Sequence, residues 1–428
     1  MKSGKLVAII LVLLLLITGV SVTVGDKYAN YDGHVLEVAA EQEQTEQRIN
    51  EVQQSTSSLQ EYYKGTGLIS VSAINGEVAA DAIENAASAK PALSSEEMPQ
   101  EPELRFMAVG DIMLGRGVGF KLQKAGSYEK AFEKVSSVLI QGDIVFANLE
   151  TPLTASTHGL DSKRKIVLRA KPETVTALTS AGFNMISLSN NHIMDYYEKG
   201  LFDTMSLLKE NNILHAGGGK NIEEARKPAI IEKNGLKIGL LAYTDMAELV
   251  FAGKPFLSFA ATADKSGVVP RKYETIREDV MNLRDKVDLL AVSLHWGVED
   301  SFAVTAEQVE FAHDLIDDGV DIILGHHPHQ FQGIELYKGK PILYSMGNFL
   351  FDQNEPENME SFIIDMNFKG AKLVELTAIP VRIIEKSYVD IQTGEQAVNI
   401  LVRQAELCRK LGMVPVTVND RLVLKQEE

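Results

Sequence analysis

Metal-binding side chains follow five short apolar stretches of the chain. Carboxylate, amide and imidazole groups stand at the ends of these stretches, namely Asp111, Asn148 with Glu150, Asn191 with His192, His295, and the group His326, His327 and His329. Oxygen and nitrogen ligands without sulfur suit Mn, Fe or Zn. Because open α/β sheets place ligand sites at the carboxyl ends of their strands, the five positions together predict a metal site.

Taken singly, most of these residues have an ordinary structural explanation. An aspartate such as Asp111 after a strand often caps a helix or closes a turn. Asparagine pairs are common in turns, and His295 could be a core histidine. Three imidazoles within four residues beside a proline, as in 326–329, rarely serve packing alone. The prediction therefore rests on the whole set.

Strand-like and helix-like segments alternate from residue 104 onward, and they are what must position these residues. Predicted strands cover 104–110, 143–149, 184–189, 236–243, 288–295, 321–326 and 341–345. Predicted helices cover 128–139, 172–182, 197–212, 272–286 and 305–319. Apolar strands separated by helices indicate an α/β fold with both sheet faces covered. Two further strands, 360–368 and 372–383, have no helix between them, which suggests a mixed or two-sheet sandwich layered with helices.

Composition excludes several classes of protein. The chain has 428 residues, 45% of them hydrophobic and 24% charged, which is typical of globular domains. Its formal charge is −17, and no long basic stripe offsets it, so we expect no nucleic-acid partner. The single cysteine, Cys408, excludes a disulfide framework, a cysteine-based zinc site and an iron–sulfur cluster.

The first 25 residues differ from the rest of the chain. An uncharged run of 19 residues, 6–24, has nearly the length of a membrane-spanning helix. A cleaved signal peptide is the alternative, although its apolar core is usually shorter, at about 7–15 residues. Lys2 and Lys5 precede the run, which by the positive-inside rule places the remaining chain outside the cytoplasm. We therefore predict a single-pass anchor in the cell membrane at residues 1–25, with an extracytoplasmic domain.

The segment 26–103 has the composition of an acidic stalk or linker. It contains 15 acidic and 4 basic residues and is rich in Gln, Ser and Ala, which is typical of a solvated segment without a core. The main domain is predicted at 104–385, followed by a C-terminal extension, 386–428, that packs on it.

Six motifs occur in a fixed order over residues 105–384: GDIMLGR, ANLETPLT, SNNHIMDY, SLHWGVE, GHHPHQFQGIE and YSMGNFLFDQ. In this series the chain resembles the bacterial capsule-synthesis CapA/PgsA family, which takes part in poly-γ-glutamate biosynthesis. That family is similar to the calcineurin-like metallophosphoesterases. The resemblance implies a four-layer α/β/β/α sandwich with a two-metal centre between its sheets, preceded here by the transmembrane helix and the acidic linker.

The resemblance also assigns residues to roles. The positions that match metal ligands are Asp111, Glu150, Asn191, His295, His327 and His329, with His326 as an alternative in the fifth motif. His192 matches the histidine that protonates a leaving group, and we group Asp195 and Arg116 with it as catalytic residues. Arg116 is expected to neutralise a carboxylate of the polymer through a fork-shaped ion pair.

Two departures from the phosphoesterase pattern remove or displace ligands of the predicted metal site. Met113 stands where the first motif would carry a histidine, and the sequence NLE replaces the usual GD of the second. Such a site would hold one of the two metals weakly or not at all, which counts against phosphatase activity.

Two functions follow from these observations. In the first, the protein is a membrane-anchored component of poly-γ-glutamate synthesis or export that handles an anionic polymer. Because it has no nucleotide-binding loop, partner subunits in the membrane would supply the ATP-driven step. The alternative is an extracytoplasmic metal-dependent hydrolase, either a phosphoesterase or an amidase.

A basic run is the densest on this acidic domain. It consists of Lys163, Arg164, Lys165, Arg169 and Lys171. It is either a solvated loop or a contact for a polyanion, since local attraction can act despite the unfavourable net charge.

Overall fold

The computed structural model describes residues 101–160, 166–251 and 254–425. The predicted anchor 1–25, most of the linker 26–103 and the basic residues 163–165 lie outside the described residues. Within the described part of the chain, no helix is both long enough and apolar enough to cross a membrane.

The larger sheet has ten strands and contains both parallel and antiparallel pairs. Along its main path the order is β19 (Val416–Val418), β20 (Arg421–Leu424), β17 (Lys372–Ile384), β16 (Glu360–Lys369), β1 (Glu103–Ile112), β2 (Ile144–Leu149), β3 (Met185–Ser187) and β4 (Leu214–Ala216). Strands β1 to β4 run parallel. Two short strands branch from this path: β15 (Asn348–Leu350) pairs with β1, and β18 (Tyr388–Ile391) pairs with β17.

The second sheet has six strands. Its order is β13 (Ile334–Tyr337), β14 (Lys340–Leu343), β12 (Ile322–His326), β11 (Leu289–His295), β7 (Leu236–Thr244) and β6 (Ala229–Lys233). The four central strands are parallel. Two small antiparallel pairs are separate from these sheets: β5 (Gly218–Gly219) pairs with β10 (Gly267–Val268), and β8 (Glu248–Phe251) pairs with β9 (Lys254–Ser258).

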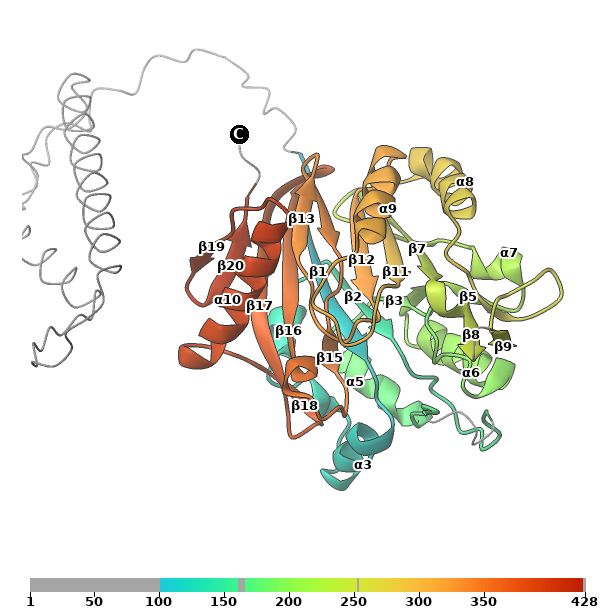
Figure 1. Cartoon of the computed structure of the whole chain (residues 1–428). Helices are drawn as coiled ribbons and strands as arrows, with labels where there is room; N and C mark the ends of the chain where they lie inside the picture. Colours follow the sequence, from blue (N-terminus) through green and yellow to red (C-terminus); the bar gives the residue numbers. More distant parts are fainter. Residues whose placement is uncertain (1–100, 161–165, 252–253, 426–428) are drawn as a thin grey trace, which may run out of the picture. The chain divides into compact units, whose positions relative to one another are not determined.

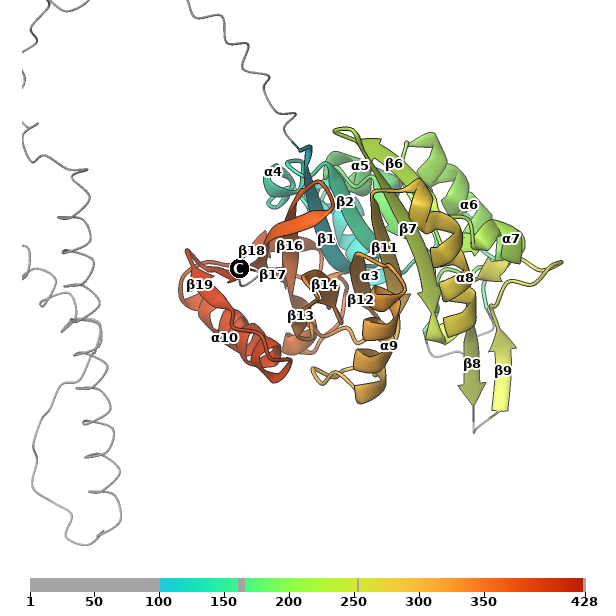
Figure 2. The same cartoon turned by 90° about the horizontal axis from the view of Figure 1, so that it is seen from above.

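Three apolar cores lie between the two sheets and between each sheet and the helices that cover it. The helices are α3 (Arg116–Lys124), α4 (Ser136–Leu139), α5 (Val175–Ser180), α6 (Tyr197–Glu210), α7 (Ile222–Ala225), α8 (Tyr273–Leu283), α9 (Ala306–Asp317) and α10 (Glu395–Lys410). Short 3-10 turns occur at Glu129–Ala131, Pro172–Thr174, Asp245–Ala247, Arg284–Lys286 and Pro356–Met359. Figures 1 and 2 show α5 and α6 on one side of the paired sheets and α8 and α9 on the other.

Strand β1 illustrates why the layers form. Phe106 belongs to the core between the sheets, whereas Met107 belongs to the core shared with α5 and α6, because successive strand residues face opposite ways. On the second sheet, alternate residues such as Val292 pack against α8 and α9. The expected α/β class with more than one sheet is confirmed.

Two local features differ from the sequence-based expectation. The helix predicted at 128–139 is wrong, because only the turn Glu129–Ala131 and the short α4 form there. The ring of Phe132 instead joins an aromatic cluster, 5.5 Å from the centroids of both Phe183 and Phe349, so tertiary packing overrides local helix propensity. Beyond residue 386, β20 pairs with β17 and extends the larger sheet, and α10 packs beside it.

Candidate metal centre

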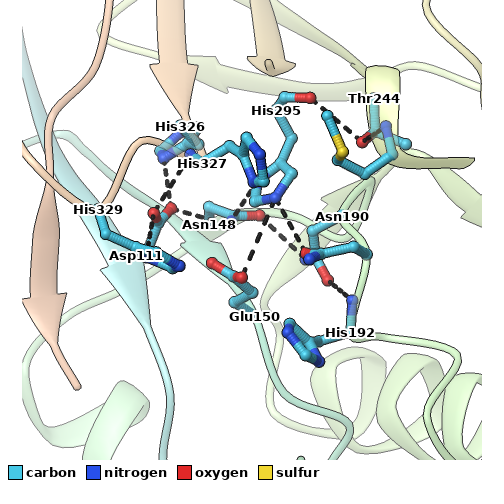
Figure 3. A network of polar contacts seen from close by, with 12 residues as sticks. Asp111, Asn148, Glu150, Asn190, His192, Thr244, His295, His326, His327 and His329 are labelled. Carbon is cyan, nitrogen blue, oxygen red and sulfur yellow. Dashed lines mark hydrogen bonds and ion pairs between the residues drawn. The ribbon is translucent and has the colours of Figure 1, made fainter. Parts of the chain in front are cut away.

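The carboxyl ends of strands from both sheets bring the polar residues together (Figure 3). Asp111 lies near the end of β1, opposite Asn148 of the parallel neighbour β2, and Glu150 follows directly after β2. From the other sheet, His295 ends β11 and His326 ends β12, and these two residues are in register. The site is therefore assembled at the carboxyl ends of strands from both sheets.

Asp111 is fully buried and accepts several hydrogen bonds. Its Oδ1 accepts from Asn148 Nδ2 and from His326 Nδ1, both at 2.9 Å, and its Oδ2 accepts from the backbone N–H of His327 at 3.3 Å. Burial alone would raise the pKa of this carboxyl group. Against this, the hydrogen bond and charge of His326, with His329 and Asn148, together lower the pKa below its usual value. Asp111 is therefore held as a carboxylate.

Asn148 connects the two sides of the site. Its Nδ2 also approaches His295 Nδ1 at 3.4 Å, and its Oδ1 accepts from Asn190 Nδ2 at 3.1 Å. Asn190 in turn accepts from the backbone N–H groups of His192 and Ile193, which fixes the turn that carries Asn191 and His192. The two asparagines thus position the residues around them.

His295 Nε2 faces oxygen atoms from two other segments. It lies 3.1 Å from Asn191 Oδ1 and 4.0 Å from Glu150 Oε1. Ligand atoms of Asp111, Glu150 and His295, all three fully buried, lie within 4.8 Å of one another. Among the described residues, this trio is the one group of three His, Cys, Asp or Glu side chains whose ligand atoms lie close enough to hold a metal ion.

The histidine group 326–329 contributes from a strained loop. His327 has φ +96° and His329 has φ +60°, a region that residues other than glycine seldom adopt and that is enriched at functional sites. The His327 ring lies 4.8 Å from the His295 ring, centroid to centroid. His329 Nδ1 donates to Asn348 at 2.9 Å and lies 3.8 Å from Asp111 Oδ2.

Burial keeps the imidazoles of His295 and His327 neutral. Burial, followed by the neighbouring histidines, lowers the pKa of His295 well below its usual value. Burial and then His329 lower the pKa of His327 to about 4. A neutral imidazole offers a lone pair, which is the form that binds a metal.

The residues fit a divalent metal ion. His326 Nε2 and His327 Nδ1 are buried, and neither has a hydrogen-bond partner among the described residues. Unsatisfied buried nitrogen atoms beside two buried carboxylates are costly unless a ligand joins them. The donor set of carboxylate, amide and imidazole is also one that Mn, Fe or Zn accepts.

His192 and Asp195 form a separate buried pair next to this group. The His192 Nδ1 donates to Asp195 Oδ2 at 2.7 Å, and the backbone N–H of Leu168 donates to the same oxygen at 2.6 Å. With the Nδ1 proton held by Asp195, the ring carries its lone pair on Nε2. This arrangement is suited to accepting or donating a proton.

The structure places Arg116 in an ion pair within the protein. Its guanidinium contacts the carboxylate of Asp352, with Nε 3.1 Å from Oδ1, and the backbone N–H of Gly117 donates to the same carboxylate at 3.0 Å. The role predicted for Arg116 toward a polymer carboxylate stays a prediction, and it would require Asp352 to be displaced.

The sequence analysis singled out some of these residues without their roles. His326 appeared as an alternative ligand, but its Nδ1 holds Asp111 in place. Asn348 was missed, although it accepts from His329 and donates to the backbone oxygen of Asn358 at 3.0 Å. Its position in the motif YSMGNFLFDQ was the available signal. Met113, which stands where a histidine ligand would be, is buried, and its sulfur accepts from the backbone N–H of Gly115.

Comparisons with known proteins agree on one group of relatives. Residues 105–353 match the family described as "Bacterial capsule synthesis protein PGA_cap". The "Capsule biosynthesis protein CapA" of Bacillus anthracis is 31% identical over 333 residues, which cover 76% of this chain and 78% of that protein. The "PGA biosynthesis protein CapA" of Bacillus subtilis (strain 168) is 30% identical over 297 residues, covering 69% and 76%. A "Probable polyglutamine synthesis accessory protein" of Mycobacterium tuberculosis is 31% identical over 349 residues, covering 76% and 90%.

Proposed function

Since the chain belongs to the bacterial capsule synthesis protein family, we propose that it takes part in the synthesis or export of capsular poly-γ-glutamate. The family match over residues 105–353 carries this proposal, because it contains every residue of the buried polar group. The names of the two Bacillus relatives, a capsule biosynthesis protein and a PGA biosynthesis protein, support the same process, and the Mycobacterium tuberculosis relative is named for polyglutamine synthesis.

A metal ion belongs to this proposal. Asp111, Glu150 and His295 would hold it. Asn191, His327 and His329, which lie beside them, would be further ligands. When bound, the ion would supply Lewis acidity toward an oxygen of the polymer. Asn148 and His326 hold the ligand side chains in position, and burial keeps bulk water away from them.

Membrane attachment and partners complete the proposal. Residues 1–25 would anchor the chain, and the acidic segment 26–103 would hold the domain at a distance from the outer face of the cell membrane. Partner subunits of the polymer synthetase in the membrane would supply the energy for bond formation. Protease added to intact protoplasts should then degrade the domain, whereas protection of the domain would contradict the extracytoplasmic orientation.

The pair His192–Asp195 favours a second candidate, a metal-dependent hydrolase that cleaves an amide or a phosphoester. A histidine oriented by a buried carboxylate can transfer a proton to a leaving group. In this reading the buried polar group and His192 act on the same bond. A site that only binds polymer would not need this proton transfer.

Complementation of a gene deletion tests both candidates. Cells that lack the gene should lose surface polymer, and the wild-type gene and a His313→Gln control should restore it. Asp111→Asn should fail to restore it. Polymer output that is unchanged by the deletion would contradict the assembly role. Full rescue by His192→Gln would favour a binding site over a hydrolase. Failure of His192→Gln to rescue, with the same metal content as the wild-type protein, would favour the hydrolase.

A further inference from the structure

A small cavity lies between helix α3 and the segment that leads into the turn Pro172–Thr174. Its volume is about 200 Å³, and it is lined by Arg116, Phe120, Gln123, Tyr128, Arg169 and Lys171 among others. Among its described lining residues there is no Asp or Glu. The charged side chains that line it are therefore all basic, although the chain carries a formal charge of −17.

Two of the three cations in this cavity contact neutral groups. Arg169 Nη1 donates to the backbone oxygen of Ser156 at 2.7 Å, and its guanidinium lies 5.4 Å from the ring centroid of Tyr196. Lys171 Nζ donates to Gln123 Oε1 at 3.1 Å. These partners are neutral, and among the described residues neither cation pairs with a carboxylate. Only Arg116 is compensated, by Asp352.

The same segment connects the cavity with the pair His192–Asp195. Leu168, next to Arg169, donates its backbone N–H to Asp195, and Tyr196, beneath the Arg169 guanidinium, follows Asp195 in the chain. Tyr196 also lines a second cavity, of about 550 Å³, together with Lys199 and Lys265. Arg169 and this second cavity therefore both adjoin Tyr196, the residue that follows Asp195.

We propose that the cavity between α3 and residues 168–171 binds a carboxylate of an acidic polypeptide, with Arg169 and Lys171 as its cations. This inference rests on the proposed function and assigns the residues that recognise the polymer. Arg169 can bind a carboxylate through two parallel hydrogen bonds, whereas Lys171 acts as a point charge. Phe120, which is 69% exposed at the cavity, offers an apolar face to the methylene groups that separate the carboxylates.

A carboxylate polymer suits the site better than a phosphate polymer. The cavity has two cations, Arg169 and Lys171, that have no carboxylate partner among the described residues. Phe120 and Tyr128 also line it. Binding to a phosphate backbone usually draws on a larger set of cations along a stripe. The mixture of sparse charge and apolar surface matches a chain in which each carboxylate is separated by several carbon atoms.

Binding of a labelled γ-linked glutamate oligomer tests the proposal. The full-length chain, purified in mild detergent, would be titrated into the oligomer and followed by fluorescence anisotropy. Lys171→Gln and Arg169→Gln should each weaken binding about threefold to tenfold, which is the range for single charge pairs with partial exposure. Lys286→Gln, which removes an exposed lysine on the turn after α8, is the matched control and should bind as the wild type does. Arg169→Lys should recover part of the loss.

Two outcomes would overturn the assignment. Wild-type affinity in both Lys171→Gln and Arg169→Gln would remove these cations from polymer binding. Equal affinity for a polyphosphate of the same charge, with the same losses in both variants, would replace the carboxylate ligand by a phosphate one. An unchanged urea-unfolding midpoint in each variant shows that the fold is retained, and Lys171, an exposed residue, is the safer of the two substitutions.

Gene deletion tests the proposed function independently of these binding measurements. If gene deletion abolishes surface polymer while the cavity variants bind normally, the proposed function stands and the cavity assignment is wrong. If deletion leaves polymer unchanged while the variants lose binding to the oligomer, the cavity assignment stands and the proposed function is wrong.

Discussion

Two polar regions of this domain are built on opposite principles. The buried group around Asp111, Glu150 and His295 is closed to solvent, and its members contact one another. The cavity around Arg169 and Lys171 is partly open, and its cations contact neutral atoms. One region gathers carboxylates and neutral imidazoles, and the other contains Arg169 and Lys171, which have no carboxylate partner among the described residues.

Burial explains why the two regions would bind different ligands. Charges interact strongly where water is excluded, so a buried carboxylate needs a cation or several hydrogen-bond donors close to it. At an open cavity the interactions are weaker and are screened by salt. The first region is therefore suited to bind one small cation tightly, and the second to bind a long anion more weakly.

Removal of Asp111 should produce the largest effect. Asp111→Ala leaves the donors on Asn148 and His326 buried and unpaired, so the free energy of unfolding should fall by about 3–5 kcal/mol. Asp111→Asn keeps the volume and an acceptor oxygen and should cost less, about 1–3 kcal/mol. Both variants should lose bound metal. Urea unfolding and metal analysis check this, and normal metal content in Asp111→Asn would show that the buried group is not a metal site.

Metal removal should have the next largest effect. A chelator should lower the stability of the wild-type chain by about 2.7 kcal/mol if the ion is present at about 100 times its dissociation constant. The same treatment should leave Asp111→Asn unchanged, because that variant binds no ion to lose. Thermal unfolding with and without chelator measures both, and equal shifts in the two proteins would contradict the prediction.

His329 should contribute less than the carboxylates. His329→Ala should weaken metal binding by about tenfold to a hundredfold, since His329 adjoins Asp111 and is oriented by Asn348. His313→Ala is the control, because His313 bonds to Glu335 and stacks on Tyr337 away from this group. Metal titration of both variants decides the point, and equal affinities would remove His329 from the site.

The comparison also shows what the sequence could predict. Apolar stretches with polar ends predicted the strands that carry Asp111, Glu150 and His295, because a buried parallel strand leaves a clear pattern. Local pattern was misleading at 128–139, where contacts of Phe132 with Phe183 and Phe349 decide the structure. Helix α10 was not predicted. Its buried face depends on contacts with β13, β17 and β20.

Partners that are far apart in the chain could not be predicted. The ion pair of Arg116 with Asp352 joins residues 236 positions apart, so Arg116 was assigned to the polymer instead. Asn148 was noted beside Glu150, but its bonds to both Asp111 and His295 depend on how two sheets meet. The basic run was recognised from composition, whereas the division between compensated Arg116 and uncompensated Arg169 appears only in three dimensions.

Salt should separate the two regions with the smallest but most selective effect. At 0.1 M ionic strength the Debye length is about 10 Å and it shortens further as salt rises, so exposed ion pairs weaken while buried contacts change little. Binding of the glutamate oligomer should therefore weaken as salt is raised. The dependence of oligomer affinity on salt should be smaller in Lys171→Gln, because this variant has one cation fewer in contact with the oligomer. Metal affinity of the buried group should stay nearly constant over the same range. Parallel titrations of the oligomer and of the metal ion at several salt concentrations measure both slopes. If the two slopes were equal, the oligomer and the metal ion would depend on charges that are equally exposed, and the division between a buried cation site and an open anion site would be wrong.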